Sequence, residues 1–257
     1  MEEKHPIVFC GAGPGDPELI TVKGQKALAL ADLVLWAGSL VPEAVLAWAP
    51  AAARRVSSAD MDLEGIVALM AQGYHAGQRV VRLHTGDPSL YGAIHEQMAA
   101  LRGQAIPFWI VPGVTAAFAA AAALGIEYTL PGKTQTLIFT RMGGRTPVPV
   151  KESLAALARH NASLVIYLSI SMAAEAASIL SEAYGPAAPC AIAHRVSHPG
   201  ECIVRTRVAD LVQTVRQHGI QRLAVILVGP ALEDGTALAA LRSKLYDRRF
   251  PHGWRTP

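Results

Sequence analysis

Cysteine is scarce in this sequence, and so are charged residues. The three cysteines, at positions 10, 190 and 202, show no C-x-x-C spacing, which excludes a zinc ribbon and a disulfide framework and fits a reducing compartment. Charged residues are only 17% of the chain, with 23 Lys and Arg against 20 Asp and Glu, so the net charge of +3 is not that of a nucleic-acid scaffold. We therefore expect a cytoplasmic protein without a nucleic-acid partner.

Neither an export signal nor an uninterrupted membrane span is expected from the sequence. Residues Met1–His5 are polar and acidic, unlike the basic region and apolar core of a signal peptide. The stretch Ala105–Ile126 has 22 residues without a charge, about the length of a membrane span. Pro107, Pro112 and Gly113 interrupt it, so a buried strand followed by a packed helix explains it better, and we expect no membrane partner.

Apolar side chains are abundant and follow a regular rhythm. They make up 51% of the 257 residues, enough for a large core, and the length exceeds the roughly 150 residues of one typical domain. In the first half, short apolar runs alternate with segments of helical period, which predicts a parallel sheet. The expected strands there are 7–10, 33–36, 80–83 and 108–111, and the expected helices are 22–30, 63–76, 93–101 and an Ala-rich one from 115.

The second half repeats this alternation with one difference. Its expected strands are 136–140, 164–168, 191–195, 203–207 and 224–228, with helices near 151–159, 171–182 and 208–217. Strands 191–195 and 203–207 are joined by only seven residues, which favours an antiparallel hairpin and hence a mixed sheet. We place a linker near 112–130. The expected division is an N-terminal α/β domain over 1–114, a C-terminal α/β domain over 115–235 and a basic tail over 236–257.

Three loops that contain glycine follow predicted strands of the first half. In Gly11–Pro17, Asp16 stands where a dinucleotide fingerprint needs its last glycine, and no Gly-Lys-Ser/Thr follows for a phosphate loop. In Thr85–Gly92, Asp87 could accept a hydrogen bond from a ligand or simply cap a helix. With Val111–Ala117, these loops could line one cleft, because the carboxyl ends of parallel strands lie on the same side of a sheet.

These loops and the segments 18–24 and 197–201 together carry a resemblance to a known family. In order and spacing they resemble the tetrapyrrole (corrin/porphyrin) methyltransferases, over about residues 5–232. Segments 36–41, 124–131 and 140–146 resemble one subgroup of that family. The resemblance implies two α/β domains of the tetrapyrrole methylase fold with S-adenosylmethionine in a cleft between them, a homodimer, no metal cofactor, and a methyl group delivered to a ring carbon of a tetrapyrrole.

Individual site residues also follow from the resemblance. It implies cofactor contacts from Gly86, Asp87, Leu90, Tyr91, Thr115, Ala116, Leu168 and Val196. It implies that Pro14, Gly15 and their loop face the tetrapyrrole. Relatives that methylate uroporphyrinogen III read Gly-Arg-Gly-Gly-Glu after the aromatic residue, whereas Gly92–Glu96 of this chain lacks the arginine, which argues against that substrate.

The chemistry asks little of the protein beyond alignment. A sulfonium is a good leaving group, so the protein has to align the methyl group with the accepting carbon and exclude water. Candidate bases for a ring proton are Glu96, Asp16 and His95. The guanidinium groups of Arg141, Arg145 and Arg195 could pair with substrate carboxylates or lie in solvent.

Two alternatives stay open, and a third, a metal site, is disfavoured. A methylase of another ring position, or of a substrate that already carries cobalt, would have a similar sequence. A tetrapyrrole carrier would use the same cleft without chemistry. His194 and His198 have the spacing of a helical metal pair, but Pro199 and Gly200 follow at once, so we expect a strand and a turn there and no metal site.

Overall fold

The structure, a computed structural model, describes residues 4–233, 235–239, 241–251 and 253–254. The chain divides into two compact units, Met1–Ala119 with Arg195–Glu201 and Ala120–His194 with Cys202–Pro257. This division differs from the expected one in three places, of which one is that the stretch 236–257, expected as a separate tail, groups with the second unit. The boundary falls inside helix α4 (Ala116–Leu124), and the segment 195–201 groups with the first unit because its contacts are with the loop after the first strand.

The sheet of the first unit is entirely parallel, which confirms the prediction. Its strands are β1 (Ile7–Gly11), β2 (Leu33–Trp36), β3 (Arg54–Ser57), β4 (Val80–His84) and β5 (Phe108–Val111), in the order β3-β2-β4-β1-β5. Strand β3 is the one that the apolar pattern missed. It lies at the edge of the sheet with Arg54 and Arg55 exposed, so it needs no apolar run.

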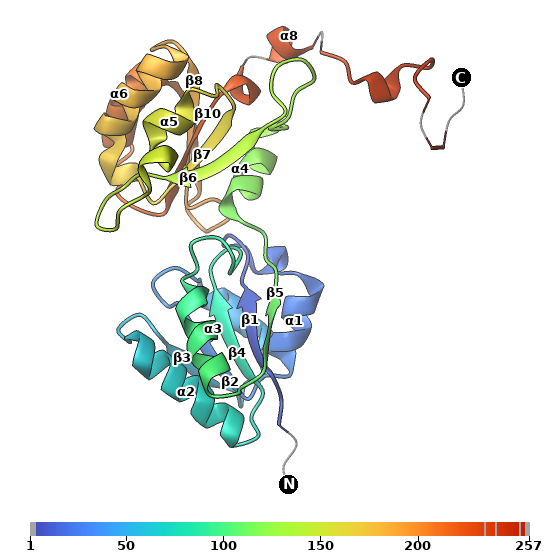
Figure 1. The fold of residues 1–257 in the computed structure, drawn as a ribbon, viewed down its shortest axis with the longest axis vertical. Coiled ribbons are helices and arrows are strands. Elements are labelled where there is room, and N and C mark those ends of the chain that lie inside the picture. Colours follow the sequence, from blue (N-terminus) through green and yellow to red (C-terminus); the bar gives the residue numbers. More distant parts are fainter. Residues whose placement is uncertain (1–3, 234, 240, 252, 255–257) are drawn as a thin grey trace. The chain divides into compact units, whose positions relative to one another are not determined.

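Helices cover both faces of this sheet (Figure 1). On one face, Val8 and Cys10 of β1 pack in a core that includes Leu28 of α1 (Val22–Ala29) and Val45 of the 3-10 helix Glu43–Trp48. On the other, Ile7 and Phe9 pack in a core with residues of α2 (Leu63–His75) and α3 (Ile94–Gly103). The alternation of side chains along β1 therefore supplies both cores.

The sheet of the second unit is mixed. Its strands are β6 (Leu137–Arg141), β7 (Ser163–Tyr167), β8 (Pro189–His194), β9 (Cys202–Arg207) and β10 (Ala224–Val228), in the order β6-β7-β10-β8-β9. Strand β7 is parallel to β6 and antiparallel to β10, and β8 is antiparallel to both β9 and β10. The predicted hairpin of β8 and β9 is confirmed.

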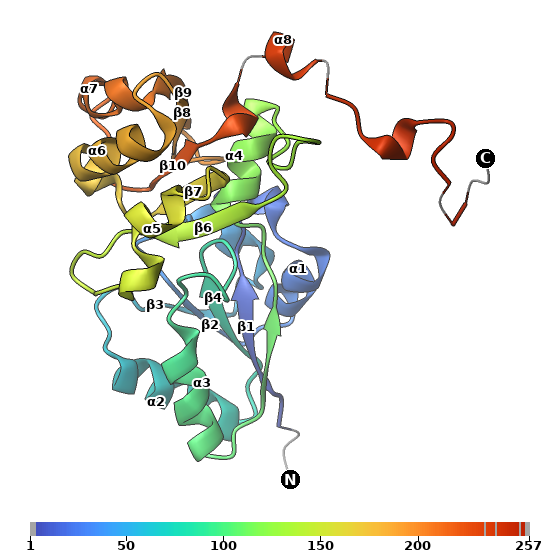
Figure 2. The same ribbon diagram turned by 45° about the horizontal axis from the view of Figure 1, so that its top comes forward.

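One core joins this sheet to helices α5 (Leu154–Ala158), α6 (Ala173–Tyr184) and α7 (Leu211–Gln217), which lie along one side of it in Figure 2. Beyond β10 the chain forms a short helix, α8 (Gly235–Leu238), and a 3-10 helix at Lys244–Tyr246. None of the helices in the described ranges combines the length and the apolar character that a membrane crossing requires. The stretch 105–126 folds as β5 and α4, as predicted.

Candidate functional site

The loops that follow β1, β4 and β5 meet through their main chains. Gly13 and Gly86 exchange two hydrogen bonds, with N···O distances of 3.3 and 2.7 Å. A Cβ on Gly11 would lie 2.6 Å from Cα of Gly113, and a Cβ on Gly113 would overlap the carbonyl oxygen of Gly86. We call Gly11, Gly13, Gly86 and Gly113 the glycine junction. Only glycine permits this approach at 11 and 113, while Gly13 and Gly86 have φ of 79° and 61°, in the left-handed region that favours glycine.

Asp87 locks the junction from the side. Its Oδ1 accepts a hydrogen bond from the main-chain N–H of Ser89 at 2.8 Å, and its Oδ2 accepts one from the N–H of Gly113, also at 2.8 Å. The first bond closes a turn and caps no helix, since α3 begins only at Ile94, whereas the second joins two loops that are 26 residues apart. Asp87 therefore holds the main chain with both carboxylate oxygens, and its first effect is to position these loops.

The rest of the β4 loop turns sharply beside the junction. Gly86 has φ +61°, Tyr91 φ 56° and Ala93 φ 48°, all in the left-handed region. Thr115, only 8% exposed, lies close to Gly86, because a Cβ on Gly86 would be 3.7 Å from its Cα. The structure thus gathers the first-unit loops that carry Gly86, Asp87, Leu90, Tyr91, Thr115 and Ala116.

The two remaining cofactor candidates lie elsewhere in the chain. Val196 is buried in the segment 195–201 of the first unit. Leu168 belongs to the second unit, directly after β7, with φ 54° and a side chain that is 67% exposed. The apolar pattern placed Leu168 at the end of the predicted strand 164–168. It therefore did not reveal that this side chain is exposed or that its φ is in the left-handed region.

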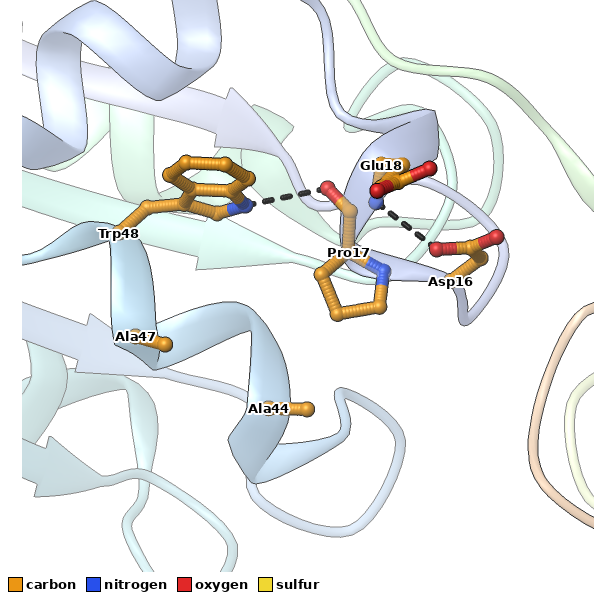
Figure 3. Close-up of a pocket in the computed structure, with 6 residues that line it drawn as sticks. All are labelled: Asp16, Pro17, Glu18, Ala44, Ala47 and Trp48. Carbon is orange, nitrogen blue, oxygen red and sulfur yellow. Dashed lines mark hydrogen bonds between the residues drawn. The ribbon is translucent and has the colours of Figure 1, made fainter.

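A shallow cavity of about 500 Å³ adjoins the loop after β1 (Figure 3). Its lining residues are Asp16, Pro17, Glu18, Ala44, Ala47 and Trp48. Asp16 caps the 3-10 helix Pro17–Leu19, with Oδ1 accepting from the N–H of Glu18 at 2.8 Å. Nε1 of Trp48 donates to the carbonyl oxygen of Pro17 at 3.1 Å. Two acidic residues in the lining make this cavity a poor receptor for carboxylate groups.

The other two base candidates lie on a helix. His95 and Glu96 are exposed in the first turn of α3, while their neighbours Ile94 and Gln97 are buried. Asp16, in contrast, is half-buried on the same loop as the buried residues Pro14 and Gly15. Of the three, only Asp16 lies on the loop that the resemblance assigns to the substrate.

Arg141 is engaged by its own loop. Its Nη1 donates to the carbonyl oxygens of Met142 at 3.2 Å and Thr146 at 3.1 Å, and its Nη2 donates to that of Pro147 at 2.9 Å. The guanidinium group therefore shapes the loop after β6, a use that the sequence did not indicate. Arg145, at the tip of that loop, and Arg195 of the first unit are both exposed.

A buried polar cluster at the end of β4 was missed by sequence reasoning. Arg82, 5% exposed, donates from Nε to Gln97 Oε1 at 3.2 Å and from Nη1 to Ser58 Oγ at 3.0 Å and Leu35 O at 3.3 Å. Burial lowers the pKa of Arg82 to about 10. These bonds tie β4 to β2, to the segment after β3 and to α3, and so support the loop that begins at Thr85.

His84 lies on the same face of β4 as Arg82 and stacks on the ring of Phe9. Its Nε2 has no hydrogen-bond partner among the described residues. Burial, and secondarily the charge of Arg82, lower the pKa of His84 to about 3, so its imidazole is neutral. The sequence does contain a sign of this buried polar cluster, because Arg82 and His84 stand at alternating positions of an otherwise apolar strand.

In the described part of the chain, no three His, Cys, Asp or Glu residues gather in a way that could hold a metal ion. His194 ends β8, and His198 lies in the turn that follows, so the predicted strand and turn are confirmed.

Known proteins of similar sequence indicate the family of this chain. The family model of the tetrapyrrole (corrin/porphyrin) methylases matches residues 6–212. The chain is 44% identical over 256 residues to a cobalt-precorrin-4 C(11)-methyltransferase of Methanocaldococcus jannaschii, covering 99% of this chain and 98% of that protein. It is 47% identical over 249 residues to a precorrin-4 C(11)-methyltransferase of Pseudomonas aeruginosa, covering 97% and 98%.

Solved structures show the same likeness. A cobalt precorrin-4 methyltransferase, CbiF, superposes with a TM-score of 0.86 at 44% identity, covering 89% of this chain and 96% of that one. The uroporphyrin-III C-methyltransferase of Thermus thermophilus in complex with S-adenosylhomocysteine superposes with a TM-score of 0.72 at 27% identity, covering 88% and 98%. The two-unit α/β fold is therefore shared with solved methyltransferases.

Proposed function

Because the chain belongs to the tetrapyrrole (corrin/porphyrin) methylase family, we propose that it transfers a methyl group from S-adenosylmethionine to C11 of precorrin-4 or of cobalt-precorrin-4. It is a methyltransferase of corrin ring synthesis. The observation that carries the site assignment is the glycine junction locked by Asp87. This junction lies at the carboxyl ends of β1, β4 and β5, the edge at which parallel α/β sheets bind their ligands.

The junction fits a ligand such as S-adenosylmethionine. Glycine at 11 and 113 lets the main chains of the three loops pack together, and Gly86, where an added Cβ would have nothing nearer than 3.7 Å, leaves its own main chain uncovered by a side chain. Thr115 adds a hydroxyl group next to Gly86, and Leu90, Tyr91 and Ala116 add apolar surface. We assign the cofactor to Gly86, Asp87, Leu90, Tyr91, Thr115, Ala116 and Val196, all of the first unit. Leu168 is a contact that the family resemblance implies.

The protein's part in the reaction is alignment. The sulfonium supplies an activated methyl group, and the loops hold it in line with the accepting carbon and keep water out. Where a proton must leave the substrate, Asp16 is the acceptor that we favour, because it lies on the loop of Pro14 and Gly15 that we assign to the tetrapyrrole. Arg145 and Arg195, both exposed, are assigned to substrate carboxylates, with Arg141 shaping the loop that presents Arg145.

We extend the proposal to assembly and location. A homodimer and a cytoplasmic location are supported by the family resemblance, and the three cysteines, all free, suit a reducing compartment. Light scattering on the eluting protein tests the dimer, and a monomer across a wide concentration range would refute it. A tetrapyrrole carrier is the competing function.

Calorimetric titration with S-adenosylhomocysteine, the demethylated product, tests the cofactor site without an unstable substrate. The wild type should bind one molecule per chain, and Thr115→Arg should abolish binding because the new side chain fills the space beside Gly86. Ala99→Arg adds the same charge at an exposed position of α3 and should bind as the wild type does. A folded wild type that does not bind would overturn the assignment and favour the carrier.

Product analysis then tests the reaction and its position. Enzymatically prepared precorrin-4 and cobalt-precorrin-4 are each incubated with S-adenosylmethionine that carries a ¹³C methyl group. A new methyl resonance at C11 is expected, and the substrate that gives the larger kcat/KM decides between the metal-free and the cobalt form. A methyl group at another ring carbon would contradict the proposal.

A further inference from the structure

The turn between β8 and β9 packs on the loop after β1. Its residues, Arg195–Glu201, group with the first unit although they connect two strands of the second. Arg195 and Ser197 have φ of 50° and 62°, a conformation that non-glycine residues keep only where their surroundings hold them. The turn is therefore shaped by specific contacts and is not a slack connection.

A chain of hydrogen bonds runs through this turn to the β1 loop. The main-chain N–H of Asp16 donates to Oγ of Ser197 at 2.9 Å. The main-chain N–H of Ser197 in turn donates to Oε2 of Glu201 at 2.6 Å. The turn is also braced internally, since the N–H of His198 donates to the carbonyl oxygen of Arg195 at 2.9 Å. Glu201 thus holds Ser197, and Ser197 holds Asp16.

The ring of His198 covers the neighbouring residue of the loop. A Cβ on Gly15 would overlap Cδ2 of the imidazole, so glycine at 15 leaves room for this ring. Burial, and to a lesser degree the charge of Arg195, lower the pKa of His198 against an opposing hydrogen-bond contribution from the main chain of Pro14, and this lowering favours the neutral ring.

The β1 loop is therefore fastened at two separate points. At Gly13 it is bonded to Gly86 of the glycine junction, and at Asp16 it is bonded to Ser197. The first fastening is on the cofactor side of the loop, and the second is on the side of Pro14–Asp16 that we assign to the tetrapyrrole. Removing the second should loosen the substrate side while the junction stays intact.

We propose that Ser197 and Glu201 are positioning residues for substrate binding, which hold the segment Pro14–Asp16 in the shape that receives the tetrapyrrole. The inference rests on the proposed function, because that function supplies the substrate. The contacts that carry it are the bond from Asp16 to Ser197 and the bond from Ser197 to Glu201.

Ser197→Ala is the first test, with Ser178→Ala in the exposed face of α6 as the matched control. Hydrogen exchange of the Asp16 amide should accelerate about tenfold in Ser197→Ala, since its acceptor is gone. The KM for the tetrapyrrole should rise about fivefold, with kcat and the Kd for S-adenosylhomocysteine within about twofold of the wild type. The control should change none of these quantities.

Two substitutions of Glu201 distinguish the effect of its hydrogen bond from the effect of its charge. Glu201→Gln keeps an oxygen that can accept from Ser197 and should preserve the KM, whereas Glu201→Ala should raise it as Ser197→Ala does. Unchanged Asp16 exchange and unchanged KM in Ser197→Ala would overturn the inference. An equal rise of the KM and of the Kd for S-adenosylhomocysteine would also overturn it, because it would mean a general loosening.

The two proposals fail in distinguishable ways. A wild type that neither binds S-adenosylhomocysteine nor methylates the tetrapyrrole defeats the proposed function. An active wild type whose Ser197→Ala variant behaves identically defeats only the positioning of the loop.

Discussion

The two units differ in how they hold their loops: the first adds close main-chain contacts to side-chain bonds such as those of Asp87, and the second relies on side-chain bonds around Arg141 and Ser169. In the first, loops of β1, β4 and β5 touch main chain to main chain because glycines remove the side chains between them. In the second, side chains do the fastening: the guanidinium of Arg141 binds three carbonyl oxygens, and Oγ of Ser169 accepts from the N–H of Met142 at 2.9 Å. Where glycines bring two main chains together, adding even a Cβ disrupts the contact. Where a side chain makes the contact, shortening that side chain removes only its own hydrogen bonds.

The units also differ in what their buried titratable groups do. The first contains His84, which burial keeps neutral. Burial raises the pKa of Cys10 in the first unit, and of Tyr184 and Cys190 in the second, to about 12, and it also raises the pKa of Tyr128, so none of these groups takes up a proton in acid. The first unit should therefore respond to acid before the second does.

Gly113→Ala should produce the largest effect, because its Cβ meets the main chain of Gly86 and no side chain can yield. We expect a loss of about 3 kcal/mol or more in the free energy of unfolding, and loss of S-adenosylhomocysteine binding. Gly103→Ala, at the end of α3 with nothing within 4 Å of the added Cβ, is the control and should change stability by less than about 1 kcal/mol. Urea denaturation measures both. Equal behaviour of the two variants would break the comparison.

Asp87→Ala should come next. It removes the acceptors of two main-chain N–H groups, and we expect a loss of about 2 kcal/mol together with weaker S-adenosylhomocysteine binding. Asp87→Asn keeps one carbonyl oxygen and should retain part of both properties. Calorimetry and urea denaturation of the three proteins give the order; wild-type binding in Asp87→Ala would show that the junction needs no lock.

Acid should destabilise the first unit through His84. Its pKa is about 3 in the folded protein against an ordinary 6.5, so the unfolded chain takes up a proton between these values and the folded chain does not. Stability is therefore full above pH 6.5 and falls as the pH falls, by about 1 kcal/mol between pH 7 and pH 5.5. Tryptophan emission follows it, because Trp36, Trp48 and Trp109 lie in the first unit. His84→Gln should flatten this dependence, and an unaltered slope would exclude His84 as its source.

Arg141 and Arg145 should give the smallest and most selective effects. Arg141→Ala frees three carbonyl oxygens and should cost about 1 kcal/mol, and Arg141→Lys should not restore it because an ammonium cannot match three acceptors. Arg145→Ala should leave stability within about 0.5 kcal/mol and raise the KM for the tetrapyrrole. Thermal unfolding and steady-state kinetics separate them. A rise in KM without loss of stability in Arg141→Ala would assign it to the substrate after all.

Much of the fold could be predicted from the sequence, because strands and helices follow from local patterns of apolar residues. The apolar runs at 7–10 and 80–83 became strands β1 and β4, and the seven-residue link between 195 and 203 became a hairpin turn. Strand β3 could not be predicted, since Arg54 and Arg55 at a sheet edge show no apolar pattern. The family was recognisable from the order and spacing of its loops.

The roles of individual side chains were harder to predict from the sequence. Arg141 and Arg145 are both cations in one loop, and nothing in their order shows that the first is bonded to main-chain carbonyls while the second is exposed. Asp87 was equally suited to capping and to ligand binding, and only the position of Gly113 shows that it joins two loops.

What the sequence determined by itself is the alternation of strands and helices, the parallel direction of the strands in the first sheet, and the presence of glycine after β1, β4 and β5. Only the tertiary structure decided that these glycines meet, that Asp87 locks them, and that Ser197 reaches Asp16 across 181 residues of chain. The physical reason is the range of each interaction. Strand and helix patterns depend on near neighbours, whereas a close approach of two main chains depends on where the whole sheet places its loops.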